Sequence, residues 1–427
     1  MDTPIYDIAI LGCGASGIAA GNKLLNNPSC NFVIFEGASR IGGRTFTDKI
    51  GRDIPVDMGG SWIHSNEVNP MAQDPAISGF QTSLDKEFPI YVYVNGKPLS
   101  SGDQIVKNFT HAKEGISPIT DISAAEHLAE EEPIITDIGD LYFGNAASGK
   151  SLHTTSMQDE SSTEPFGFGL LFKDGMGNFI TSKAGKLFSE GKIQLNTTIC
   201  EIDYSKRSVI KMQDIHGNAH YAKKIIVTAS IGVLKGGLIR FMPELPESHL
   251  SALDALEMGN MEKFVFALDE SFFEKRGITK NTNYMIIDEG QPPLFAHLRT
   301  AGNPTITVFT GGDVSKALIS KGKFAAEKII LERLKTVFGD GFTPSLNAVD
   351  SSNWTQNPLT EGSYSGAKIG GHWARKALTA PVDQRIHLAG EAIAHSPNWY
   401  VHIYGAIASG EIAAEKALGT QSRSAKI

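Results

Sequence analysis

Cysteine is scarce in this chain: Cys13, Cys30 and Cys200 are scattered over 427 residues. Their odd number and wide spacing exclude a disulfide framework and give no metal-binding pattern, and they favour reduced thiols in a cytoplasmic protein. Long apolar runs are also lacking, since none comes near the roughly 20 residues that a membrane-spanning helix needs. The first seven residues, MDTPIYD, contain no basic residue, which argues against a signal peptide.

An excess of positive charge is missing as well. The 39 Lys and Arg residues are outnumbered by 47 Asp and Glu residues, which gives a net charge of -8. Nucleic acid is therefore not expected as a partner, and electrostatic steering mildly favours a cationic substrate. A hydrophobic content of 41% is ordinary for a soluble globular protein, and the length suits two connected domains.

A glycine-rich motif near the N-terminus is the strongest signal that the chain carries. DIAILGCGASG predicts a strand at residues 7–11, a tight turn, and a helix over residues 15–27. In such a motif Gly12 permits the turn, Gly14 lets a pyrophosphate approach the backbone, and Gly17 allows close packing of helix on strand. Ser16 belongs to the same motif, at the start of the predicted helix, and the amide end of that helix faces the anion.

An acidic residue follows the second predicted strand, residues 31–35. Glu36 stands nineteen residues after Gly17, where a carboxylate can accept hydrogen bonds from both ribose hydroxyls and repel a 2′-phosphate. The adenosine half of FAD or NAD fits this pattern, and NADP does not. RIGGR, residues 40–44, then exposes backbone amides and adds Arg44 beside the pyrophosphate.

GASRIGGRTFT followed by VDMGGSWIH resembles the flavin-containing amine oxidase family, which includes polyamine oxidases, monoamine oxidases and related amino-acid oxidases. The resemblance implies an α/β fold, with a Rossmann-type, glutathione-reductase-like FAD-binding domain and an interleaved α+β substrate-binding domain. We expect the FAD-binding domain at residues 1–69, 172–232 and 346–427. The substrate-binding domain is then expected at residues 70–171 and 233–345.

The segment DMGGSWIH passes beneath the flavin in this family, which implies cofactor contacts for Gly60, Ser61 and Trp62. His64 is implied on the substrate side, with an ordinary solvent-facing loop histidine as the alternative. Amino-acid oxidases of the family carry an arginine just after the paired glycines. Here Trp62, Ile63 and His64 stand there instead, which disfavours an amino-acid substrate.

Lys263 opens the apolar stretch KFVFAL. On composition alone such a lysine is usually a solvated residue at the start of a strand. The family, however, places a lysine at this point of a similar segment, where it holds a water against flavin N5 and assists the reaction with oxygen. An ammonium near N5 would stabilise the negative charge that develops when dioxygen takes an electron.

Further cofactor positions are implied by resemblance in the second half of the chain. Ile199 lies in a segment expected near the adenine ribose, and Trp354 is expected to pack by the flavin ring. Gly390 and Glu391 follow a strand, where the carboxylate would bind ribityl hydroxyls or the diphosphate. From about residue 402 we expect a helix of small residues that can lie tightly against the cofactor, with a close-packed interior helix as a compatible alternative.

An aromatic residue beside the flavin face would select a neutral amine. The chain offers Trp399, Tyr400, His402 and Tyr404, of which Tyr400 is the candidate; its aromatic partner stays unassigned.

The resemblance implies FAD-dependent oxidation of a polyamine or monoamine. The neutral amine would pass a hydride from the carbon beside nitrogen to flavin N5, the imine would hydrolyse, and oxygen would reoxidise the flavin to give hydrogen peroxide. No cysteine follows Cys200, so the covalent attachment found in some relatives is not expected. Open alternatives are a biosynthetic flavin desaturase or amide oxidase, an L-amino-acid oxidase, and a flavoprotein that only binds or regulates. A cytoplasmic monomer or homodimer is expected, without a metal.

Overall fold

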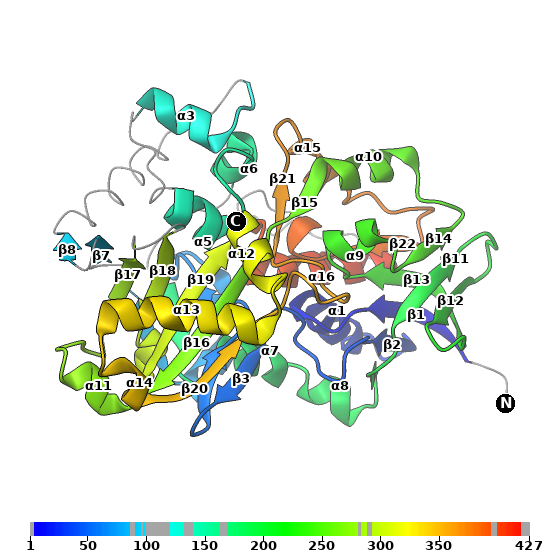
Figure 1. Cartoon of the computed structure of the whole chain (residues 1–427). Helices are drawn as coiled ribbons and strands as arrows, with labels where there is room; N and C mark the ends of the chain where they lie inside the picture. Colours follow the sequence, from blue (N-terminus) through cyan, green and yellow to red (C-terminus); the bar gives the residue numbers. More distant parts are fainter. Residues whose placement is uncertain are drawn as a thin grey trace. The chain divides into compact units, whose positions relative to one another are not determined.

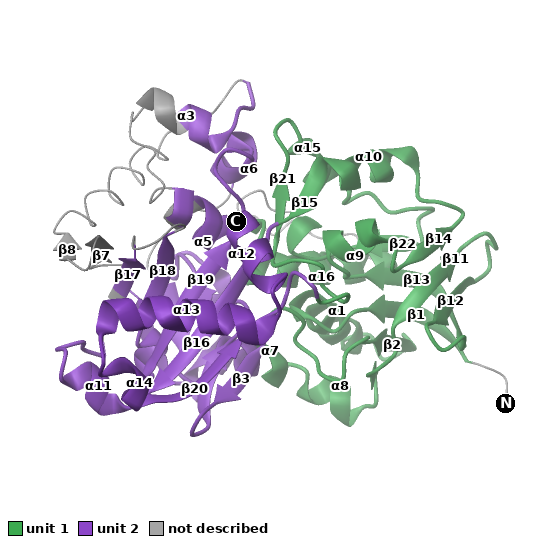
Figure 2. Cartoon of the chain, viewed as in Figure 1, with its two compact units in different colours: residues 1–45, 180–258, 357–427 green, residues 46–179, 259–356 purple. Residues whose placement is uncertain are grey.

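The computed structural model describes residues 4–85, 90–94, 97–99, 120–131, 140–162, 169–280, 283–287, 293–393 and 399–419. Figure 1 traces their helices and strands along the chain. Two compact units, coloured green and purple in Figure 2, are built from alternating stretches of sequence. Unit 1 contains Met1–Thr45, Ile180–Met258 and Asn357–Ile427, and unit 2 contains Phe46–Phe179 and Gly259–Gln356.

These divisions differ from the domain boundaries expected from the sequence. The hairpin of β3 (Thr47–Ile50) and β4 (Ile54–Asp57) falls in unit 2, because Ile50 and Val56 pack with Val265 and Ala267 of the unit 2 sheet. Conversely, α9 (Ile231–Gly236), α10 (Glu247–Ala255) and β15 (Leu256–Met258) fall in unit 1, since their apolar side chains lie in its core.

Unit 1 is built on a sheet whose strands follow the order β10, β2, β1, β13, β12, β11, β14, with β22 also paired to β13. Its strands are β1 (Ile5–Leu11), β2 (Phe32–Phe35), β10 (Ile193–Gln194), β11 (Ile199–Asp203), β12 (Ile210–Asp214), β13 (Ala219–Val227), β14 (Arg240–Met242) and β22 (Ile386–Leu388). β1 pairs in parallel with β2 and β13, so that Ile8 lies opposite Phe32 and Lys224. Because β1 is flanked on both sides, Ile8 to Leu11 are buried, as expected for a central parallel strand.

The helices of unit 1 include two that pack against each other, α1 (Ala15–Leu25) and α16 (Ile403–Leu418). The predicted strand at 7–11 and helix over 15–27 are thus confirmed, with small differences at their ends. The remaining elements of this unit are α8 (Gly185–Ser189), β21 (Ser365–Ala367), α15 (Trp373–Ala377) and the 3-10 turn η5 (Glu391–Ile393), while α7 (Met176–Ser182) crosses the division between the units.

Unit 2 is built on a second sheet, in the order β20, β16, β19, β18, β17, β7, β8. These strands are β20 (Leu346–Ser351), β16 (Met261–Leu268), β19 (Thr305–Gly311), β18 (Leu294–Leu298), β17 (Asn283–Ile287), β7 (Ile90–Val94) and β8 (Lys97–Leu99). Neighbouring strands are antiparallel except β17 and β7. A small sheet of β5 (Trp62–Ile63), β9 (Gly169–Phe172) and β6 (Thr82–Asp85) belongs to the same unit.

The two faces of the unit 2 sheet have different neighbours because side chains alternate along a strand. On β16, Phe264, Phe266 and Leu268 pack on one face against α11 (Glu270–Glu274), α12 (Gly312–Ile319), α13 (Lys323–Phe338) and α14 (Phe342–Ser345). Lys263 therefore points to the opposite face. The other short elements are η1 (Pro70–Gln73), η2 (Pro75–Gly79), α3 (Ala124–Glu131), η3 (Asp140–Asn145), α5 (Ala146–Ser148), α6 (Met157–Ser161) and η4 (Thr300–Gly302). Among the described helices, none is long and apolar enough to cross a membrane.

Candidate functional site

The glycine loop of unit 1 separates glycines that the fold requires from one that it does not. Gly12 has φ +101°, and a Cβ there would lie 2.5 Å from Thr228 Oγ1. A Cβ on Gly17 would lie 2.0 Å from the Gly12 carbonyl oxygen. At Gly14 the nearest atom would be Gly43 Cα at 3.8 Å, an ordinary contact. Packing within the protein therefore does not require glycine at position 14. The absence of a side chain there leaves room at the N-terminus of α1 for a bound group.

Ser16 lies in the first turn of α1 and is buried, with 4% of its surface exposed. Its Oγ has no hydrogen-bond partner among the residues that the structure describes. A buried hydroxyl in this state costs about 1–3 kcal/mol. The first-turn amides of a helix lack intrahelical acceptors too, and together such donors suit a phosphate oxygen. The loop therefore fits the pyrophosphate expected from the sequence.

Glu36, at the end of β2, is 8% exposed. Its Oε2 accepts a hydrogen bond from the Cys13 amide at 2.6 Å and its Oε1 one from the Ala38 amide at 2.9 Å. Burial raises the pKa of this carboxyl, and the two amides oppose the rise. Each oxygen keeps a further lone pair, so the carboxylate is held in place and can still accept ribose hydroxyls.

Ile199 lies in a segment that approaches Glu36, because the Thr197 amide donates to the Glu36 carbonyl at 2.8 Å. The Ile199 side chain itself is buried in the unit 1 core with Ile202 and Tyr204. Any contact of Ile199 with a nucleotide would therefore have to come from its backbone, which the sequence pattern did not distinguish.

Two predicted cofactor residues, Arg44 and Glu391, form an ion pair in unit 1. Arg44 Nη1 donates to Glu391 Oε1 at 3.0 Å and to the Ser363 carbonyl at 2.8 Å. The neighbouring Gly390 has φ +136°, and a Cβ there would meet only the Thr228 carbonyl oxygen at 3.9 Å. The Arg44 charge is thus matched by a carboxylate, beside a second stretch of backbone that leaves room for a bound group.

Arg375 was not recognised in the sequence because it lies in a short basic helix, α15. It is fully buried, and its Nη1 donates to Ser365 Oγ at 2.9 Å. Ser365 in turn donates to Glu391 Oε2 at 2.7 Å. The guanidinium carbon lies 4.8 Å from the centre of the Tyr400 ring, which is 6% exposed. The structure therefore places the candidate Tyr400 in a buried network with Arg375.

Two small residues of α16 make close contacts with other parts of unit 1. A Cβ on Gly410 would lie 2.1 Å from the Ser16 carbonyl oxygen, so Gly410 permits contact between α16 and α1. Ser409 Oγ accepts from the Gly390 amide at 3.2 Å and donates to the Ile393 carbonyl at 2.8 Å. Ser409 and Gly410 therefore make close contacts within the protein, and a contact of this helix with the cofactor stays a prediction.

Lys263 is a buried cation of unit 2, with 4% of its surface exposed. Its Nζ donates to the carbonyl oxygens of Asp57 at 2.9 Å and Gly59 at 2.5 Å, and to Ser61 Oγ at 2.6 Å. Burial lowers the pKa of Lys263 to about 8, and the Asp57 charge opposes the fall. The alternative of a solvated lysine at a strand end is therefore wrong. Ser61, a predicted cofactor residue, is one of the three hydrogen-bond acceptors of Lys263.

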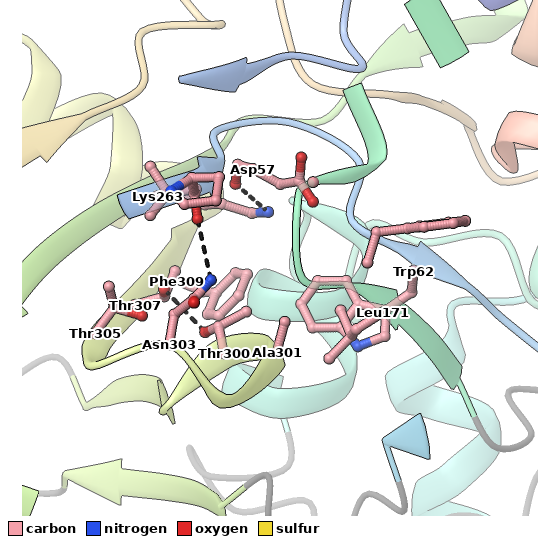
Figure 3. A pocket seen from close by; sticks show the side chains of 14 residues that line it. Asp57, Trp62, Leu171, Lys263, Thr300, Ala301, Asn303, Thr305, Thr307 and Phe309 are labelled. Carbon is pink, nitrogen blue, oxygen red and sulfur yellow. Dashed lines mark hydrogen bonds between the residues drawn. The ribbon is translucent and has the colours of Figure 1, made fainter. Parts of the chain in front are cut away.

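A small cavity adjoins Lys263 on the face of the sheet away from the helices. Figure 3 shows Lys263 and Asp57 on one side, with threonines of β19 and η4 on the other. Thr300 and Thr307 are hydrogen-bonded to each other at 3.2 Å, whereas Thr305 Oγ1 is buried without a partner among the described residues. A polar cavity with such an atom suits an ordered water.

Trp62 lines the same cavity. Its indole Nε1 donates to Asp85 Oδ2 at 2.7 Å, and the Lys263 Nζ lies 5.3 Å from its ring centre. The ring of the predicted His64 stacks on the Trp62 ring, with 6.1 Å between the two ring centres. His297, fully buried, packs on Trp62 at 5.7 Å, and burial lowers its pKa to about 4, so its ring is neutral. Asp85 and His297 carried no recognisable sequence pattern.

Trp354 belongs to unit 2 as well and is 7% exposed. Its Nε1 donates to the Met58 carbonyl at 2.8 Å, and its ring packs with Val56, Val265 and Ala267. Gly60 lies between Gly59 and Ser61, which both contact Lys263. The unit 2 residues that the sequence pointed to therefore gather around Lys263, and the unit 1 residues around the glycine loop and the Arg44–Glu391 pair.

Comparison with known proteins gives a consistent result. Residues 15–112 and 112–418 match the family model described as flavin containing amine oxidoreductase. Polyamine oxidase 3 of Oryza sativa subsp. japonica is 28% identical over 444 residues, covering 95% of this chain and 88% of that protein. A structure of wild-type putrescine oxidase bound to putrescine has a TM-score of 0.78 at 18% identity, covering 98% of this chain and 100% of the other. Cyclohexylamine oxidase from Brevibacterium oxydans has a TM-score of 0.75 at 20% identity, with 97% and 99% covered. The predicted fold class is confirmed.

Proposed function

The chain belongs to the family of flavin-containing amine oxidoreductases and is a flavin-dependent enzyme, and we propose that it oxidises a polyamine or monoamine with non-covalently bound FAD. The names of two similar proteins, polyamine oxidase and putrescine oxidase, support this substrate class. The absence of cysteine after Cys200 supports non-covalent binding. A cytoplasmic location, and a monomer or homodimer, stay predictions from the sequence.

Residues of unit 1 would hold the adenosine end of FAD. The space at Gly14 and the unpartnered Ser16 hydroxyl suit the pyrophosphate, and the fixed Glu36 carboxylate suits the ribose. When bound, the flavin ring supplies a two-electron acceptor for the carbon-hydrogen bond beside the amine nitrogen.

The observation that carries the proposed reaction with oxygen is the buried Lys263 ammonium. Removing an ammonium from water costs several kcal/mol, and here three acceptors hold it in one place. A fixed positive charge with little water around it is suited to stabilise negative charge that develops on dioxygen. We assign this role to Lys263. His64 and Tyr400 are proposed as contacts of the amine.

The overall reaction balances with the amine, dioxygen and water as reactants. A secondary amine loses two electrons and two protons to become an imine, and dioxygen takes up both to form hydrogen peroxide. Water then converts the imine to an aldehyde and a primary amine. Only the neutral amine has the lone pair that assists loss of hydride, so activity should rise with pH as the substrate ammonium is deprotonated.

The test is anaerobic mixing of the purified yellow enzyme with spermidine, spermine, putrescine and a set of aromatic monoamines. Bleaching of the flavin band by one of them, followed by peroxide on admission of air, is the expected result. If no amine bleaches the flavin, the function moves to the desaturase or amide-oxidase class, whose substrates are larger and not basic. Bleaching by an L-amino acid alone would favour the amino-acid oxidase alternative.

A further inference from the structure

Glu262 is a fully buried carboxylate directly before Lys263 on β16. Its Oε1 accepts the Thr355 amide at 2.7 Å, and its Oε2 accepts the Trp354 amide at 3.0 Å and the Ser352 hydroxyl. All these contacts are neutral donors, and among the described residues Glu262 has no ion-pair partner. Burying a charge costs free energy unless the charge is well hydrogen-bonded, which indicates that this carboxylate has a specific role.

Ser352 connects Glu262 to the backbone of Lys263. The Lys263 amide donates to Ser352 Oγ at 2.9 Å, and the Ser352 amide donates to the Lys263 carbonyl at 2.9 Å. Because the Ser352 hydroxyl gives its proton to Glu262, its oxygen is left oriented to accept from Lys263. The loop 352–355 is thereby fastened to β16 at the residue that carries the ammonium.

The side chains of Lys263 and Trp354 meet again at the segment 57–59. Lys263 Nζ donates to the carbonyls of Asp57 and Gly59, and Trp354 Nε1 donates to the carbonyl between them, that of Met58. Three consecutive carbonyls are thus occupied by these two side chains. Together with Glu262 and Ser352, the contacts close a ring of hydrogen bonds, so neither side chain can shift without disturbing the other.

We propose that Glu262 is a positioning residue, whose carboxylate fixes the loop 352–355 and thereby holds the Trp354 indole and the Lys263 ammonium together on the segment 57–59. The inference rests on the proposed function only in assigning Lys263 to the reaction with oxygen. This role requires that both side-chain oxygens of Glu262 accept hydrogen bonds. A glutamine would present an NH₂ group to at least one of these donors, so Glu262→Gln keeps the shape and removes at least one of the hydrogen bonds that hold the loop 352–355.

A matched control lies on α13. Glu327 is 9% exposed and accepts the Ser351 hydroxyl at 2.8 Å, one residue before Ser352. Glu262→Gln and Glu327→Gln therefore make the same chemical change in two buried glutamates that bond adjacent serines. Only Glu262 is joined to the Lys263 and Trp354 ring.

Two measurements test the proposal on the intact, flavin-loaded enzyme. The flavin is reduced by light with EDTA as the electron donor, so that no substrate amine is needed, and its reoxidation is followed after mixing with oxygen. We expect Glu262→Gln to slow reoxidation by about 5- to 100-fold, the effect of disturbing buried hydrogen bonds to a charged group, and Glu327→Gln to stay within about twofold of the wild type. Hydrogen exchange of the peptide containing the Trp354 and Thr355 amides should be faster in Glu262→Gln alone.

Wild-type oxygen kinetics in Glu262→Gln, or an equal defect in Glu327→Gln, would overturn the proposal. Trp354→Phe keeps an aromatic ring and loses the hydrogen bond to the Met58 carbonyl, so it should also slow reoxidation. In the double variant Glu262→Gln/Trp354→Phe, the fold reduction in the reoxidation rate should be smaller than the product of the two single reductions. Independent effects would contradict a shared ring. If Glu262→Gln does not fold, Ser352→Ala and Trp354→Phe carry the test, and normal kinetics in both would refute it. Failure of every amine to reduce the wild type would instead count against the proposed function.

Discussion

Replacing Lys263 with methionine separates the charge of this side chain from its bulk. Methionine is similar in length and apolar, so the change removes the ammonium beside Asp57, Gly59 and Ser61 without opening a large cavity. Loss of one preorganised group that stabilises developing negative charge typically slows a reaction by about 10²- to 10³-fold. We expect a reduction of this size in the rate at which oxygen reoxidises the light-reduced enzyme.

The folded structure should survive this substitution because two effects on stability largely offset each other. Burial lowers the pKa of Lys263 from 10.5 to about 8, which corresponds to about 3 kcal/mol spent on keeping the lysine charged at neutral pH. The three hydrogen bonds of Nζ contribute roughly 1 kcal/mol each. Lys263→Met removes both terms but also takes this donor from the Asp57 and Gly59 carbonyls and the Ser61 hydroxyl, so we expect a net loss of about 1–3 kcal/mol in the free energy of unfolding.

Stopped-flow absorbance at the flavin band measures the oxygen reaction, and urea unfolding measures stability. Lys235→Met serves as the control, since Lys235 Nζ also donates to a backbone carbonyl, that of Leu256 at 2.6 Å, in unit 1. An oxygen reaction of Lys263→Met as fast as that of the wild type would refute the role assigned to Lys263. A slow reaction that Lys235→Met reproduces would refute its specificity.

Three further predictions follow from the same structure. Between pH 8 and 10.5 the unfolded chain keeps a proton on Lys263 that the folded protein has lost, so the free energy of unfolding of the wild type in urea should rise with pH over this range. A rise of equal size in Lys263→Met would contradict the lowered pKa of Lys263. Gly12→Ala should destabilise the protein by about 1–3 kcal/mol or more, because the φ of Gly12 is +101° and the new Cβ would meet Thr228. Gly14→Ala should keep the thermal stability of the flavin-free protein, because its Cβ has room, and should bind FAD at least about tenfold more weakly. Ser16→Ala should leave the flavin-free protein as stable or more stable by up to about 1 kcal/mol, and should weaken FAD binding in titrations; unchanged affinity would remove Ser16 from the cofactor site.

The dinucleotide motif was readable in advance because its geometry is local. A buried strand, a glycine with positive φ and the first turn of a helix are all contained within residues 5–25, and neighbouring residues along the chain set their conformations. The α/β fold class was implied by the family resemblance that this motif and the segments after it carry. The ends of these elements were predicted less well, since the termini of helices and strands depend on contacts outside them.

The arrangement around Lys263 depends on contacts between residues far apart in the chain. Lys263 and Asp57 are separated by 206 residues, and Arg44 and Glu391 by 347. No periodicity relates such positions, so the pattern allowed Lys263 to be either a solvated residue or a buried cation. Its 4% exposure excludes the first.

Residue types and local spacing were therefore enough to indicate the nucleotide loop, and the motifs of the chain carried the resemblance that implied the family and its fold class. The pairing of Arg44 with Glu391, the contact of Gly410 with α1, and the ring that joins Glu262 to Lys263 became visible only with the folded chain. The physical reason is that burial and long-range hydrogen bonding decide whether a polar side chain is solvated, structural or poised for chemistry. Those properties arise from segments that meet in space, and the amino-acid order records them only indirectly.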